Sequence, residues 1–142
     1  MFDLKNKTAV VTGSGSGIGK AVALLLAKQG ANVHLLDLNP DGIKATAEEI
    51  KNNKGNAWEQ PCDVTNQQQV NLLFEKIGKV DILVNSAGVS HVGNIENTSS
   101  DDMDRLYQVN VKGVYHCLQA AVKIMLITPS RPRLSFFNVR ML

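Results

Sequence analysis

The 142-residue sequence predicts an α/β fold in which helices cover both faces of a parallel sheet. Short apolar runs alternate with amphipathic stretches through residues 1–126, and short loops join them. The apolar runs are continuous, as in strands that are buried on both faces. Such a pattern is typical of a doubly wound sheet with right-handed crossovers, here with about four strands and four helices.

The first strand and the first helix are joined by residues 7–20, KTAVVTGSGSGIGK. An apolar run at residues 9–11 predicts a buried strand, and the amphipathic run that begins at Ile18 predicts a helix. The N–H groups of a first helical turn have no helical partner and lie at the positive end of the helix dipole. A bound phosphate is therefore favoured over a turn without a ligand. The turn comprises Thr12, Gly13, Ser14, Gly15, Ser16, Gly17, Ile18 and Gly19.

Apolar spacing predicts the buried face of the first helix, with Gly30 ending it and a second strand running to Asp37. The residues of that face are Ile18, Val22, Leu25 and Leu26. A second helix begins with Asn39 as its cap and Pro40 in its first turn. Its buried residues are predicted to be Ile43, Ala47 and Ile50.

A third strand is predicted at residues 57–61 and a fourth, strongly apolar one at residues 80–85. The helix between them should end at Gly78 and bury Val70, Leu73, Phe74 and Ile77. After a polar loop, one long helix is predicted at residues 100–126. Its expected buried stripe comprises Met103, Tyr107, Asn110, Val114, Cys117 and Ala121.

Composition excludes several classes of protein. A net charge of +2 without a basic run gives no support for nucleic-acid binding, and no apolar run has the length of a membrane span. The two cysteines and three histidines lack metal-ligand spacing, so no metal site is expected. Without a signal-peptide pattern, the expected location is the cytoplasm.

Four motifs in order resemble the short-chain dehydrogenase/reductase family across almost the whole of residues 5–126. They are the glycine turn, Asp63-Val64, Asn85-Ser86-Ala87-Gly88 and Asn110. One departure is Ser86, where the family usually has asparagine. The resemblance implies the N-terminal part of a Rossmann-like fold, a dinucleotide as the bound small molecule, and hydride transfer between nicotinamide and a carbonyl or alcohol substrate. A 3-oxoacyl reductase and an alcohol dehydrogenase are examples of that activity.

The resemblance also implies the roles of individual residues. The glycine turn would contact the pyrophosphate and ribose, and Asp63 with Val64 would hold the adenine. Asn85, Ala87 and Gly88 would line the adenosine ribose and approach the nicotinamide. Asn110 would anchor a water of the family's proton relay, which makes it the one catalytic residue of the family that this sequence retains.

Asp37 predicts NAD as the cofactor. It follows the second strand, where a carboxylate can accept both hydroxyls of the adenosine ribose. The same carboxylate would repel the additional phosphate of NADP. Its neighbours Leu38 and Asn39 offer no cation, and neither does Ser16 in the glycine turn.

The Tyr-x-x-x-Lys motif of the family is absent from this sequence. Its two tyrosines are Tyr107 and Tyr115, and the residues four positions later are Val111 and Gln119. Residues 127–142, ITPSRPRLSFFNVRML, do not match the pattern of the family's fifth strand, although residues 134–139 have strand propensity. We therefore expect an incomplete NAD-binding domain at residues 1–126 and an atypical tail at residues 127–142.

Three functional hypotheses follow. The first is the cofactor-binding fragment of an oxidoreductase, inactive or nearly so by itself. The second is a non-catalytic nucleotide-binding or regulatory module, and the third is a non-functional truncated product. A methyltransferase also uses a glycine-rich first turn, but Asn85 and Asn110 speak against it. A fourth strand with an unpaired outer edge, unless the tail covers it, would favour association. The resemblance also implies a homo-oligomer, because the family's fourth helix helps form subunit contacts.

Overall fold

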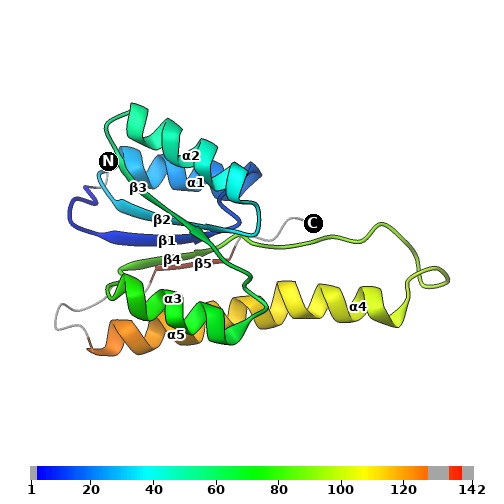
Figure 1. The fold of residues 1–142 in the computed structure, drawn as a ribbon. Coiled ribbons are helices and arrows are strands. Elements are labelled where there is room, and N and C mark those ends of the chain that lie inside the picture. The colour runs from blue at the N-terminus through cyan, green and yellow to red at the C-terminus, as the bar shows by residue number, and fades with distance from the viewer. Residues whose placement is uncertain (1–2, 128–134, 139–142) are drawn as a thin grey trace.

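A computed structural model describes residues 3–127 and 135–138, and it consists of a parallel sheet between two layers of helices (Figure 1). The strand order is β3-β2-β1-β4-β5, and every neighbouring pair is parallel. The chain therefore runs outward from β1 to β3 and returns to the other side of β1 at β4. The strands are β1 Thr8–Thr12, β2 Asn32–Asp37, β3 Asn56–Pro61, β4 Ile82–Asn85 and β5 Ser135–Asn138. This order confirms the predicted doubly wound, Rossmann-like α/β class.

Each face of the sheet has its own apolar core. Helices α1, Gly17–Lys28, and α2, Pro40–Asn52, cover one face, while α3, Gln67–Ile77, and α5, Val114–Ile127, cover the other (Figure 1). Within β1, Ala9 and Val11 belong to the first core and Val10 to the second. All five residues of β1 are buried, which explains why its sequence is a continuous apolar run.

The second helix begins, and the third helix ends, as the sequence predicts. The Asn39 side chain accepts hydrogen bonds from the N–H groups of Asp41 and Gly42, and Pro40 occupies the first turn. Helix α3 ends at Gly78, whose φ of 71° is left-handed. The predicted buried residues of α2 are confirmed, while those of α3 are either buried or packed against the core.

The predicted buried face of α1 is correct only in part. Its buried residues are Gly19, Ala23 and Ala27, while Ile18 is 40% and Leu25 58% exposed. The helix lies so close to the sheet that its smallest side chains occupy the contact. The larger apolar residues are displaced to the flanks, where Val22 and Leu26 remain partly buried against the core.

The predicted long helix is interrupted. It consists of α4, Ser100–Tyr107, a π-helix η1, Gln108–Gly113, and then α5. Met103 and Tyr107 are 56% and 53% exposed, and Asn110 is exposed as well, so the first part of the predicted stripe is wrong. Figure 1 shows the reason, because α4 extends beyond the sheet and has no strand beneath it. The hydrogen-bonded loop of a π-helix also contains one residue more than that of an α-helix, so the spacing of the apolar residues that face the sheet changes there.

The structure has a fifth strand, one more than the four that the sequence predicts. Strand β5 pairs in parallel with β4, with Ile82 opposite Ser135 and Asn85 opposite Asn138. Most of the predicted tail lies outside the described residues, and these four residues cover the outer edge of β4. Ladder hydrogen bonds use backbone groups, so a segment without the family pattern can still pair there.

The core prediction concerns Phe74, which is 1% exposed at the centre of α3. Replacing Phe74 with Ala is expected to lower the free energy of unfolding by about 3–5 kcal/mol, because it removes buried apolar surface and leaves a cavity. Urea denaturation followed by circular dichroism measures this. The matched control is Leu72→Ala in the same helix, since Leu72 is 60% exposed. Equal losses for the two variants would contradict the packing of α3.

Candidate cofactor-binding site

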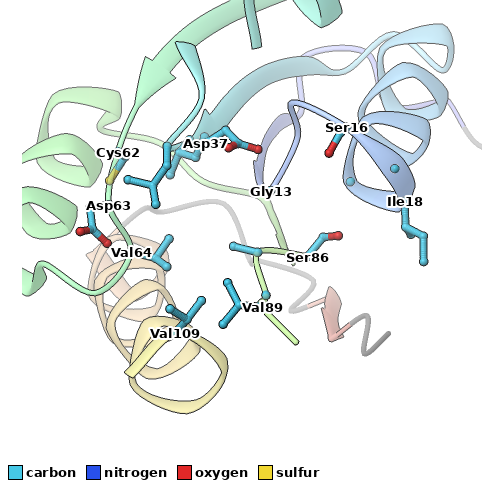
Figure 2. Close-up of a pocket in the computed structure, with 16 residues that line it drawn as sticks. Gly13, Ser16, Ile18, Asp37, Cys62, Asp63, Val64, Ser86, Val89 and Val109 are labelled. Atoms are coloured by element: carbon cyan, nitrogen blue, oxygen red, sulfur yellow. The ribbon is translucent and has the colours of Figure 1, made fainter. Parts of the chain in front are cut away.

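A cavity of ≈ 280 Å³ lies at the carboxyl ends of the central strands, where the strand order reverses (Figure 2). In an open α/β sheet this reversal leaves a crevice that is the usual ligand site. Figure 2 shows Gly13, Ser16 and Ile18 on one side, and Cys62, Asp63 and Val64 on the other. The lining residues are Gly13, Ser16, Gly17, Ile18, Gly19, Leu36, Asp37, Leu38, Cys62, Asp63, Val64, Ser86, Ala87, Gly88, Val89 and Val109.

The glycine turn brings the start of α1 directly onto the end of β1. Gly13 has a φ of 65°, and a Cβ there would lie 2.7 Å from the backbone nitrogen of Ala87. A Cβ on Gly19 would collide with the Gly13 carbonyl oxygen. The Ser16 side chain makes no capping hydrogen bond to the first turn of α1. These features fit an anionic group at the helix start, where backbone N–H groups and the helix dipole favour negative charge.

The carboxylate of Asp37 is held in place from two sides. Oδ2 accepts a hydrogen bond from the Gly15 N–H at 2.9 Å, and Oδ1 accepts one from the Asn39 N–H at 3.0 Å. A carboxylate oxygen can accept more than one hydrogen bond, so each retains capacity for a ligand hydroxyl. Asp37 therefore presents a fixed negative charge at the wall of the cavity.

The opposite wall is formed by the segment that follows β3. Asp63 Oδ1 accepts hydrogen bonds from the Thr65 N–H at 2.9 Å and the Thr65 hydroxyl at 2.7 Å. The buried His116 on α5 places Nδ1 2.9 Å from the Val64 carbonyl oxygen. A carbonyl can only accept, so Nδ1 carries the proton. A Cβ on Gly113 would lie 2.7 Å from a Val64 methyl carbon, so α5 and η1 pack tightly against this wall.

Two side chains order the turn that follows β4. Thr12 Oγ1 accepts hydrogen bonds from the N–H groups of Ser86 at 3.1 Å and Ala87 at 3.0 Å. Asn110 Oδ1 accepts from the Val89 N–H at 2.9 Å, and its Nδ2 donates to the Val89 carbonyl at 2.8 Å. The predicted buried asparagine is thus an exposed residue whose amide pairs with the backbone of the loop.

The structure brings most of the predicted cofactor residues together. Four predicted residues do not line the cavity. Ser14 and Asn85 are buried, Gly15 donates a hydrogen bond to Asp37, and Asn110 accepts one from the Val89 N–H. Sequence reasoning missed Leu36, Cys62, Ser86, Val89 and Val109, most of which adjoin a motif in sequence. It also missed Thr46 and His116, whose signal was a polar residue on an otherwise apolar helix face.

Residues 3–127 and 135–138 contain neither a cluster of metal-binding side chains nor a membrane-spanning helix. No group of three or more His, Cys, Asp or Glu side chains in these ranges could hold a metal ion. No helix there is both long enough and apolar enough to cross a membrane.

The sheet order and the glycine turn place the chain in the Rossmann-like class of α/β proteins. The pattern of the short chain dehydrogenases matches residues 7–133, and the chain belongs to this family. Members of the family bind NAD or NADP. The chain is 41% identical over 126 residues to an uncharacterized oxidoreductase of Thermotoga maritima, covering 87% of this chain and 50% of the relative. It is 37% identical to D-threitol dehydrogenase of Mycolicibacterium smegmatis, covering 88% and 50%.

Solved structures agree with the family assignment. A 7α-hydroxysteroid dehydrogenase complexed with NADH and 7-oxo glycochenodeoxycholic acid is 36% identical with a TM-score of 0.80, covering 86% of this chain and 49% of that one. A metagenomic short-chain oxidoreductase in complex with NADP is 30% identical with a TM-score of 0.90, covering 99% and 64%. The chain spans about half the length of the curated relatives that it matches.

Both cysteines are buried in the same apolar core, and Cys62 also lines the cavity. Burial raises the pKa of Cys62 from 9.0 to about 11, and the charge of Asp63 adds to the effect. Burial also raises the pKa of Cys117 to about 12, with a smaller contribution from Cys62. The folded protein therefore keeps both thiols protonated at a pH where unfolded thiols ionise.

This difference predicts a loss of stability at alkaline pH. The unfolded state loses its thiol protons above about pH 9 and the folded state does not, so the free energy of unfolding falls as the pH rises from 9 toward 11. The melting temperature, measured between about pH 8 and about pH 10.5, reports this fall. The double variant Cys62→Ala/Cys117→Ala should show a shallower pH dependence. Equal slopes for the variant and the wild type would exclude the thiols as its source.

Proposed function

We propose that this chain binds NAD(H) in the cavity at the carboxyl ends of the central strands, and that it is the cofactor-binding part of a hydride-transferring oxidoreductase. The observation that carries the proposal is the Asp37 carboxylate, held toward the cavity by the N–H groups of Gly15 and Asn39. Such a carboxylate accepts ribose hydroxyls and repels a ribose phosphate. Leu38, the next residue, brings no positive charge to the wall.

The other walls match the rest of a dinucleotide. Gly17, Ile18 and Gly19 would hold the pyrophosphate at the start of α1. Asp63 and Val64 would contact the adenine, and Ala87 and Gly88 would lie along the ribose toward the nicotinamide. Buried Asn85 would act from behind this turn. When bound, NAD(H) supplies the hydride acceptor or donor.

The substrate is proposed only as a carbonyl or alcohol compound. The two relatives with a named activity differ, since one is a D-threitol dehydrogenase and the other a 7α-hydroxysteroid dehydrogenase. We also propose a cytoplasmic location and association into a homo-oligomer; the first rests on composition and the second on the family resemblance.

A second candidate is a nucleotide-binding module without catalysis. This sequence contains no Tyr-x-x-x-Lys motif. Tyr107 and Tyr115 are more than half exposed, and the Tyr115 hydroxyl accepts a hydrogen bond from Gln119 at 2.8 Å. Neither tyrosine is followed four positions later by a lysine, which favours binding over turnover in this chain.

The cofactor prediction is a preference for NAD over NADP. Isothermal titration calorimetry with both cofactors should give the tighter binding for NAD. Asp37→Ala should weaken NAD binding roughly tenfold or more, because charge-assisted hydrogen bonds are lost, and it should narrow the preference. Asp41→Ala, which makes the same change in charge outside the cavity, is the control. Equal or stronger binding of NADPH by the wild type would rule out the role given to Asp37.

The activity prediction is that this chain alone turns over carbonyl substrates far below ordinary enzyme rates. A positioned general acid contributes roughly 10²–10⁴-fold, and among residues 3–127 no tyrosine lines the cavity. The measurement is NADH oxidation with a panel of ketones and ketoacyl thioesters, using protein free of host reductases. Ordinary rates that Tyr107→Phe or Tyr115→Phe abolishes would show that a tyrosine on α4 or α5 is the acid.

A further inference from the structure

Thr46 is a polar residue in the middle of α2 with no exposed surface. Its Oγ1 lies 3.0 Å from the Ser14 carbonyl oxygen and 3.0 Å from the Gly42 carbonyl oxygen. The second contact is the local bond to the preceding turn that any helical threonine can form. The first joins α2 to the glycine turn across 32 positions of sequence, so it is a tertiary contact.

The Ser14 carbonyl belongs to the same peptide unit as the Gly15 N–H. That N–H donates to Asp37 Oδ2 at 2.9 Å. A trans peptide is planar, and its C=O and N–H groups point in opposite directions. Thr46 and Asp37 therefore hold one rigid plane from its two sides, and turning the carbonyl away from Thr46 would turn the N–H away from Asp37.

The remaining bonds of Ser14 do not fix this plane. Its N–H and its hydroxyl both bond to the Leu36 carbonyl, at 3.2 Å and 3.3 Å. These contacts hold Ser14 against β2 but leave rotation about its Cα–C bond open. The orientation of the following peptide thus depends on Thr46 at one end and Asp37 at the other.

We propose that Thr46 is a positioning residue for ribose recognition. Its hydroxyl orients the Ser14–Gly15 peptide, and the Gly15 N–H in turn orients the Asp37 carboxylate toward the ribose of the dinucleotide. Thr46 does not line the cavity and acts through this one peptide. The inference rests on the proposed NAD site and adds to it a determinant of the choice between NAD and NADP.

The contact of α2 with this peptide leaves little room for movement. A Cβ on Gly42 would lie 3.1 Å from the Gly15 Cα and 3.1 Å from the Gly15 carbonyl oxygen. Such distances are tighter than ordinary van der Waals contact, so Gly15 would have to move. Gly42→Ala therefore disturbs the same peptide by a second route, while alanine has the higher helix propensity of the two residues.

The test compares Thr46→Val, which removes the hydroxyl and keeps the branched shape, with Thr46→Ser, which keeps the hydroxyl. Calorimetry with NAD and NADP on the full 142-residue chain should show that Thr46→Val binds NAD roughly three- to tenfold more weakly than the wild type. The ratio of the NADP to the NAD dissociation constant should also be smaller in this variant. Thr46→Ser should retain the preference. Hydrogen exchange measured by NMR should be faster at the Gly15 amide in unliganded Thr46→Val.

A double-mutant cycle with Asp37→Ala separates this role from a general structural one. If Thr46 acts through the carboxylate, Thr46→Val changes the preference in the wild type and leaves it unchanged in the Asp37→Ala background. An equal effect in both backgrounds, or a wild-type preference in Thr46→Val, overturns the inference while the proposed function stands. A wild-type chain that binds neither dinucleotide overturns the proposed function and the inference with it.

If Thr46→Val does not fold, Gly42→Ala decides the question. It should narrow the preference for NAD over NADP and speed hydrogen exchange at the Gly15 amide. A full preference in folded Gly42→Ala would show that the Ser14–Gly15 peptide does not control ribose selection.

Discussion

The close approach of α1 to the end of β1 is the contact on which the rest of the structure depends. No side chain fits at Gly19 against the Gly13 carbonyl, or at Gly13 against the backbone of Ala87. Strand β1 is the central strand and pairs with both β2 and β4. A displacement of α1 would therefore shift the glycine turn relative to the turn after β4. The two glycines thus set the width of the cavity as well as the packing of the helix.

The elements that the sequence predicted correctly are those whose pattern and capping agree. Helix α2 combines an asparagine cap, a first-turn proline and an apolar face, and β1 is apolar throughout. The face of α1 was not predictable from apolar spacing, because close packing against β1 selects glycine and alanine over leucine. The π-helix at Gln108–Gly113 changes the phase of the pattern without any glycine or proline signal before it. Strand β5 depends on backbone pairing, which side-chain patterns describe least well.

The cavity shows the same division between local and tertiary signals. Residues that face it could be predicted because they fall in short motifs at the ends of strands. The residues that hold those motifs in place could not, since each acts across a long sequence separation. Thr46 bonds to Ser14, and His116 bonds to Val64. Each partner on the cavity side is a backbone group, so the side chains of the motif do not indicate which residue supports it.

Binding and chemistry are separated along this chain. The groups that suit a dinucleotide lie at the ends of β1 to β4 and are held by hydrogen bonds within residues 3–127. Of the residues that the family resemblance assigns to proton transfer, the sequence retains Asn110, and both polar atoms of its side chain pair with Val89. An amide neither donates nor accepts a proton readily near neutral pH, so Asn110 here shapes the loop beside Gly88. Under the proposed function, Asp37 would select the cofactor, while proton transfer would depend on an acid other than Asn110.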